Sequence, residues 1–95
     1  MDGQQADSPE ILRECIAYPD EGRSAIRYRL MEGELDGRPT YDIRCQAEEG
    51  WYQEVAVVLD VTSEKETAER LLADLWRGEV TPYALVETVS EWLLR

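Results

Sequence analysis

Histidine is absent from the 95-residue sequence, and its absence excludes several kinds of chemistry. Histidine is the commonest general base, the usual partner of a nucleophilic serine or cysteine, and the commonest zinc ligand. Cys15 and Cys45 are the only cysteines, and two thiols cannot complete a structural zinc site unless carboxylates or a second chain contribute. The sequence therefore predicts a protein that is not an enzyme and that holds no metal and no cofactor.

Other potential catalytic groups are scarce or poorly placed. Lys65 is the only lysine and stands near a predicted helix start, where water should keep it charged. Paired carboxylates occur only at predicted turns and helix starts, so nothing separates their pKa values as acid–base catalysis requires. These pairs are Asp20/Glu21, Glu48/Glu49 and Glu64/Glu66.

Long apolar segments are also missing. The run over residues 55–59 is far shorter than the roughly 18–20 residues of a membrane-spanning helix. Met1 leads into a polar segment and not into the basic and apolar run of a signal peptide. We therefore expect a cytoplasmic protein with reduced thiols, in which Cys45 is a buried and unreactive side chain.

Basic residues are few, with 10 Lys and Arg against 21 Asp and Glu, which gives a formal charge of −11. Phosphate groups of nucleic acids and anionic lipids would be repelled by this charge. We expect no nucleic-acid partner and no membrane partner. The acidic balance is typical of a soluble surface, although mimicry of nucleic acid is a second interpretation.

The hydrophobic pattern alternates at every second residue through the first two thirds of the chain, which predicts strands. Residues 25–31, 40–48 and 54–61 show this alternation, and Asp36-Gly37 and Glu49-Gly50 supply the turns between them. Residues 11–18 fit a strand or a helix, and the hairpin residues Pro19-Asp20-Glu21-Gly22 that follow favour a strand. Residues 1–8 predict a disordered N-terminus ahead of a single domain over residues 9–95.

The last predicted strand is given an inward row and an outward row. Its inward row is Val55, Val57, Leu59 and Val61. Its outward row is Glu54, Ala56, Val58 and Asp60.

Two helices follow, because the apolar period changes to that of a helix after Thr62. Ser63 and Glu66 have the spacing of a capping box, and Gly78 can end the first helix in the left-handed conformation. Thr81 and Pro82 are typical of the start of the second helix. The chain is therefore predicted to be an α+β domain, a four-stranded antiparallel meander followed by two C-terminal helices packed on one sheet face.

Three arginines are predicted to share the outward sheet face, namely Arg27, Arg29 and Arg44. Such a cluster could hold a carboxylate or phosphate in a small-ligand or anion-binding regulatory domain. The simpler interpretation is cross-strand pairing with nearby carboxylates. The carboxylates expected to pair are Asp42, Glu48 and Glu54.

Tyr52, Ala56 and Val58 are apolar at positions predicted to face water, and Trp51 stands beside a turn. These four residues are the candidates for an interface with a protein partner or with a second copy of the chain. Cover by the N-terminal segment or a bulge within the monomer is the alternative for the strand, and packing over the core is the alternative for Trp51. We expect a non-enzymatic interaction or regulatory module.

The last third of the chain resembles a family of short bacterial proteins from anaerobic Gram-positive species, known only as a domain of unknown function. The resemblance lies in strand, turn and helix residues over most of residues 24–94. They are Tyr28-Arg29-Leu30, Asp36-Gly37, Tyr41-Asp42-Ile43, Asp60-Val61-Thr62-Ser63, Leu71-Leu72, Leu75, Glu79-Val80-Thr81-Pro82, Leu85-Val86-Glu87-Thr88-Val89 and Trp92-Leu93. The resemblance implies a compact cytosolic domain and carries over no site residues.

Overall fold

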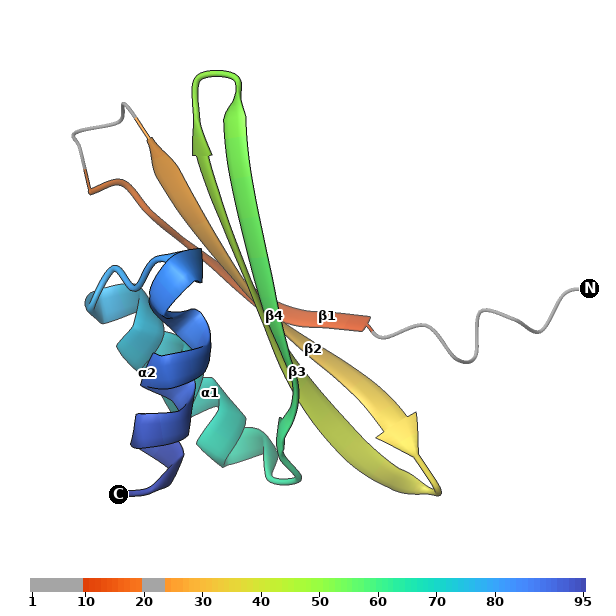
Figure 1. Ribbon diagram of the computed structural model, residues 1–95. Coiled ribbons are helices and arrows are strands. Elements are labelled where there is room, and N and C mark those ends of the chain that lie inside the picture. Colours follow the sequence, from red (N-terminus) through yellow and green to blue (C-terminus); the bar gives the residue numbers. More distant parts are fainter. Residues whose placement is uncertain (1–9, 20–23) are drawn as a thin grey trace, which may run out of the picture.

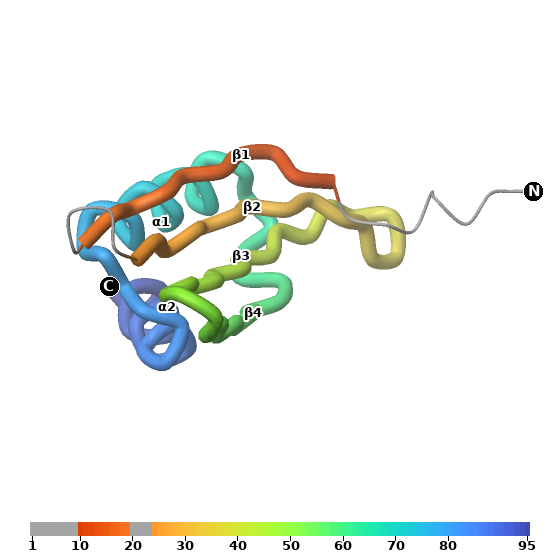
Figure 2. The backbone as a smooth tube through the Cα atoms, turned by 90° about the horizontal axis from the view of Figure 1, so that it is seen from above, coloured from red at the N-terminus to blue at the C-terminus, as the bar shows by residue number. Residues whose placement is uncertain are grey.

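The computed structural model describes residues 10–19 and 24–95, and its strands form one antiparallel sheet (Figure 1). The strands are β1 (Glu10–Ala17), β2 (Ala25–Leu35), β3 (Arg38–Glu49) and β4 (Tyr52–Thr62). They lie side by side in the order β1-β2-β3-β4, as Figure 2 shows. The predicted strand over residues 11–18 is confirmed, while the prediction for residues 1–8 lies outside the described residues.

Helical segments follow the sheet and cover one of its faces (Figure 1). They are α1 (Lys65–Arg77), the short 3-10 helix η2 (Pro82–Ala84) and α2 (Leu85–Leu93). Helix α1 packs against β1 and β2, whereas α2 packs mainly against β4. The predicted α+β class, with its meander and two C-terminal helices on one sheet face, is confirmed.

The core lies between the sheet and the helices. Alternate side chains of β2 and β3, including Tyr28, Leu30 and Ile43, are fully buried there. Leu72 of α1 and Val89 of α2 meet them from the other layer. Burying such apolar side chains contributes about 1.5–3 kcal/mol each, which makes this layer contact the main source of stability.

Both tight turns between the long strands have the backbone that their residues favour. Asp36 (φ 54°) and Gly37 (φ 80°) form the two-residue turn from β2 to β3, as a type I′ hairpin requires. Gly50 has φ 61° at the first position of the turn from β3 to β4. Positive φ costs glycine little because it has no Cβ, so both predicted turns are confirmed.

The predicted register of β4 is wrong because the strand bulges at Asp60. Tyr41 pairs with Thr62 and Ile43 pairs with Val58, so residues 59–61 lie opposite the single residue Asp42. Asp60 has φ 53°, and its backbone N–H donates to Oδ1 of Asp42 at 2.7 Å. Since side chains alternate along a strand, the extra residues of the bulge put Val61 on the opposite face of the sheet from Val55 and Val57.

As a result, the two predicted rows of β4 exchange faces before the bulge. Ala56 and Val58 lie partly buried against the core, whereas Val55 and Val57 face away from the helices. Only Val61 points inward as predicted.

The ends of α1 also differ from prediction. The residue that caps its start is Glu64, whose carboxylate accepts a hydrogen bond from the Thr67 hydroxyl at 3.1 Å, and the Ser63/Glu66 capping box is not formed. At the other end Gly78 is right-handed, and Glu79 takes the left-handed conformation with φ 51°. Val80 then donates its N–H to the carbonyl of Leu75 at 3.2 Å, which completes a Schellman motif.

Replacing Glu79 by glycine is expected to raise the free energy of unfolding by about 0.5–1 kcal/mol, because glycine removes the Cβ strain of a left-handed residue. Chemical denaturation measures the effect. Glu79→Ala is the matched control, since it removes the carboxylate but keeps the Cβ. An equal gain in both variants would show that charge, and not backbone strain, is responsible.

Replacing Asp42 by alanine is expected to lower the free energy of unfolding by about 1–3 kcal/mol, because the N–H of Asp60 loses its acceptor. Asp42→Asn keeps an acceptor oxygen and is expected to lose less than half as much. Thermal and denaturant unfolding of both variants provide the comparison. Similar losses would argue against the hydrogen bond as the cause.

Candidate functional site

The candidate site is the sheet face that the helices leave uncovered, called here the outer face (Figure 1). One row of paired residues crosses its centre from β1 to β4 and consists of Glu14, Arg29, Arg44 and Val57. The pairing places both apolar and charged side chains side by side on this face. All three predicted arginines belong to it, since Arg27 stands two residues before Arg29 on β2.

Two of the arginines share one carboxylate. Oε2 of Glu14 lies 2.7 Å from Nε of Arg29 and 3.4 Å from Nη1 of Arg27. The hydrogen bond from Arg29 is the main cause that lowers the pKa of the Glu14 carboxyl, and the positive charge of Arg27 adds to it. Glu14 thus partly neutralises the cluster, and as an exposed pair it contributes little to stability.

Cross-strand pairing was predicted, but with the wrong partners. Asp42 accepts the N–H of Asp60, and Glu48 accepts the side-chain amide of Gln46 at 2.9 Å. Glu54 lies on the helix-covered face, opposite Ala47. Glu14 was missed because the register of the first strand could not be derived from its sequence.

Arg44 is the arginine of the cluster that does not pair with Glu14. Its Nε is buried and has no hydrogen-bond partner among the described residues. The side chain stands between Arg29 on β2 and Val57 on β4. A buried donor without an acceptor costs about 1–3 kcal/mol. No carboxylate forms an ion pair with Arg44 among the described residues, so the charge of its guanidinium is not neutralised.

An exposed apolar row lies beside Arg44 on β4. Val55, Val57 and Leu59 are 46%, 42% and 69% exposed. The predicted interface residues Ala56 and Val58 instead contact the core, so they cannot contribute to the outer face. Sequence reasoning missed the exposed row, and the one signal for it was Asp60, a residue type that tolerates left-handed backbone.

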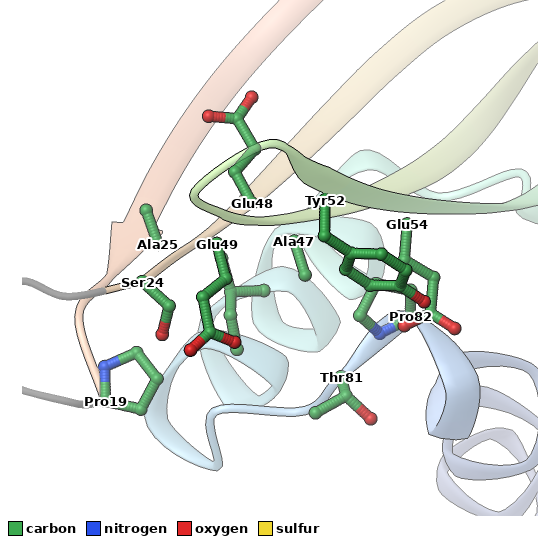
Figure 3. Close-up of a pocket in the computed structure, with 11 residues that line it drawn as sticks. Pro19, Ser24, Ala25, Ala47, Glu48, Glu49, Tyr52, Glu54, Thr81 and Pro82 are labelled. Atoms are coloured by element: carbon green, nitrogen blue, oxygen red, sulfur yellow. The ribbon is translucent and has the colours of Figure 1, made fainter.

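The other two interface candidates lie at the tip of the β3–β4 hairpin. Trp51 is 93% exposed, and its ring meets that of Tyr52 edge to face with centroids 6.4 Å apart. Tyr52 points toward Pro82 on the helix-covered side (Figure 3). The structure therefore separates Tyr52 from the outer face.

Tyr52 belongs to the lining of a cavity of about 230 Å³ between the hairpin and η2 (Figure 3). Glu49 turns into this cavity, whereas the carboxylate of Glu48 turns away from it. The lining residues are Pro19, Ser24, Ala25, Ile26, Ala47, Glu48, Glu49, Tyr52, Glu54, Thr81 and Pro82. The apolar walls and acidic side chains make it a poor site for an anion.

Cys45 is buried as predicted, and its thiol donates to the carbonyl of Val80 at 3.6 Å. Burial, with a smaller effect of the Glu54 carboxylate, raises the pKa of the thiol from 9.0 to about 12. Since the thiolate is the reactive form, this environment favours an inert side chain.

Stability is expected to fall as pH rises from 9.0 toward 12, because the unfolded chain releases the Cys45 proton while the folded chain keeps it. The thiol contribution to the pH dependence is at most about 1.4 kcal/mol per pH unit. Denaturant unfolding across this range should show a shallower decline for Cys45→Ser than for the native chain. Parallel declines would contradict the assignment.

No cluster of three or more potential metal ligands occurs among residues 10–19 and 24–95. Neither α1 nor α2 has the length and apolar character that a membrane span requires, and no other described segment forms such a helix.

The chain matches a known protein family over most of its length. The model for a family of unknown function, DUF6514, matches residues 10–95. Neither a curated protein nor a solved structure matches the chain.

Proposed function

Because the chain belongs to the DUF6514 family, whose function is unknown, we propose a function from the geometry of its outer face. The protein is a non-enzymatic interaction module that binds a protein partner through this face. The observation that carries the proposal is the exposed row Val55, Val57 and Leu59 beside Arg44, whose Nε has no acceptor among the described residues.

The composition of the outer face supports a protein partner. Interfaces combine an apolar centre with arginine, and arginine is among the residues that dominate binding energy. Val57 and Arg44 are direct cross-strand neighbours, so a partner covering one also covers the other. Covering them would remove apolar surface from water and would bring a partner carboxylate beside a guanidinium that forms no ion pair among the described residues.

The partner is expected to present a carboxylate next to apolar side chains. Glu14 already pairs with Arg27 and Arg29, whereas Arg44 forms no ion pair among the described residues, so Arg44 is where we expect a partner carboxylate to bind. The formal charge of −11 supports a protein and not a nucleic acid or an anionic membrane as the partner. Two free thiols and the resemblance to short bacterial proteins support a cytoplasmic location.

A second candidate function is the binding of a small anion, and the unpaired Nε of Arg44 favours it. A thermal-shift screen with phosphates and small carboxylates tests this candidate. A rise in melting temperature that disappears in Arg44→Met would favour it. No rise across the screen would exclude it and leave the protein partner.

The protein partner is tested by affinity capture from the source cell with native, Arg44→Met and Val57→Asp chains as bait. The partner is expected to bind both variants at least about tenfold more weakly, as the loss of a buried charge contact or the burial of a new charge requires. Leu94→Ala, at an exposed position at the C-terminus, is the matched control and should bind normally. A partner that binds all four chains equally would overturn the proposal.

Arg44→Met also separates binding from folding. Because the Nε of Arg44 has no acceptor among the described residues, its loss is expected to leave the free energy of unfolding unchanged or to raise it by up to about 1 kcal/mol. A marked loss of stability would show that Arg44 is needed for the fold. The proposal that Arg44 serves binding would then lose support.

A further inference from the structure

Strand β4 is an edge of the sheet and carries few of the features that protect edges. It pairs with β3, and no described strand pairs with its other side (Figure 2). Glu54 is the only charged residue between Tyr52 and Leu59, although charged residues make up 33% of the chain. Natural edge strands avoid association by charge, proline and bulges, and this stretch has no lysine, proline or bulge.

The opposite edge is protected. Strand β1 has a bulge between Ile11 and Arg13, and Arg13 and Glu14 follow it directly. Arg13 forms an ion pair with Glu69 of α1 at 3.4 Å. The two edges therefore differ in their capacity to pair with another strand.

The flank of α2 on the side of β4 is also apolar and exposed. Val86 is 59% exposed and Leu93 is 41% exposed. With about 3.6 residues per turn, both lie on one side of buried Val89, whereas Trp92 lies on its other side. The indole of Trp92 donates to Asp74 of α1 at 2.7 Å, so the side of α2 that carries Val86 points away from α1, while Leu93 near the end of α2 also borders Thr67 and Arg70 of α1.

This flank and the edge of β4 face the same side of the molecule. Helix α1 lies against β1 and β2, and α2 lies against β4, as Figures 1 and 2 show. Side chains of α2 that point away from α1 therefore lie on the side of the free edge of β4. Glu87 and Glu91 fall on the side of α2 opposite Val89, outside the apolar flank.

We propose that two copies of the chain join edge to edge through β4, with the apolar flanks of their α2 helices in contact. The sheet of four strands becomes a continuous antiparallel sheet of eight. Antiparallel pairing follows from the two-fold symmetry of a homodimer, in which the same surface serves both chains. The proposal goes beyond the outer-face function, because the edge contact leaves the outer face of both copies open.

Charge disfavours two registers of this contact. A two-fold axis at Glu54 would place this carboxylate opposite its own copy, and an axis at Val57 would place Glu54 opposite Asp60 of the partner chain. Like charges directly opposite each other destabilise a strand pair. Among the axes that avoid both, the one at Ala56 sets Val55 of each chain opposite Val57 of the other on the outer face, and we assign this register because it pairs apolar side chains.

A second copy of the chain is the partner that fits this surface. A strand added to β4 must be largely uncharged and apolar over about seven residues, and β4 itself meets this requirement. In the proposed dimer, the two-fold axis that pairs the strands also brings the exposed Val86 of each chain toward Val86 of the other. Another chain would have to supply both elements at once.

Sedimentation velocity and light scattering over a concentration series, in high salt to screen the net charge of −11, test the proposal. The expected mass is twice the 11.0 kDa of one chain. Val57→Lys and Val86→Lys are each expected to weaken the dimer at least about tenfold, since each places a charge at the contact. Circular dichroism confirms that the variants fold, which their exposed positions favour.

Ile11→Lys is the matched control, because Ile11 is 54% exposed at the protected edge. Its dimer should be as stable as that of the native chain. A native chain that remains monomeric, or a dimer that Ile11→Lys weakens as much as Val86→Lys does, would overturn the proposal. Val86 lies off the outer face, so failure of the dimer and failure of partner binding are distinguishable.

Discussion

The carbonyl oxygen of Val80 connects the helical layer of this protein to the sheet through hydrogen bonds. It accepts the hydroxyl of Tyr28 at 2.8 Å and the thiol of Cys45 at 3.6 Å, both from the buried face of the sheet. Without this acceptor two polar groups would be buried unsatisfied, which is costly in an apolar core. Burial accordingly raises the pKa of the Tyr28 hydroxyl. The position of Val80 depends in turn on left-handed Glu79, which turns the chain from α1 back toward the sheet.

The helices cover only one face of the sheet, and this determines the character of the other face. Since both helices pack on the same face, the second face keeps whatever side chains the alternation of the strands places there. On β1 to β3 these include Arg27, Arg29 and Arg44 beside the apolar Ile16 and Met31, and Glu14 balances part of the positive charge. On β4 they are Val55, Val57 and Leu59, which no described segment covers. The outer face thus combines an arginine centre with an apolar margin, and that combination is what distinguishes it from an ordinary solvated surface.

Most of the architecture could be predicted from local patterns. The alternation around Tyr28 and Ile43, the Asp36-Gly37 turn and the change to a helical period after Thr62 each depend on nearby residues, and the structure confirms them. The register of β4 could not be predicted in this way. It depends on the hydrogen bond between Asp60 and Asp42, which are distant in sequence, and on a left-handed residue that is not glycine. This one bulge moved Ala56 and Val58 to the core and made Val55 and Val57 the exposed row. The shared carboxylate of Glu14 was hidden for a similar reason, because its partners depend on the pairing of β1 with β2.

The difference between the two sheet edges limits the size of any assembly that β4 can build. An interface that uses the same edge of both chains consumes that edge, and the outermost strands of the product are then the two β1 strands. Their bulge at Leu12 and the charges of Arg13 and Glu14 interrupt the flat row of backbone groups on which a further strand could grow. Association therefore stops at a dimer, and a chain with one edge strand able to pair does not form open-ended fibres.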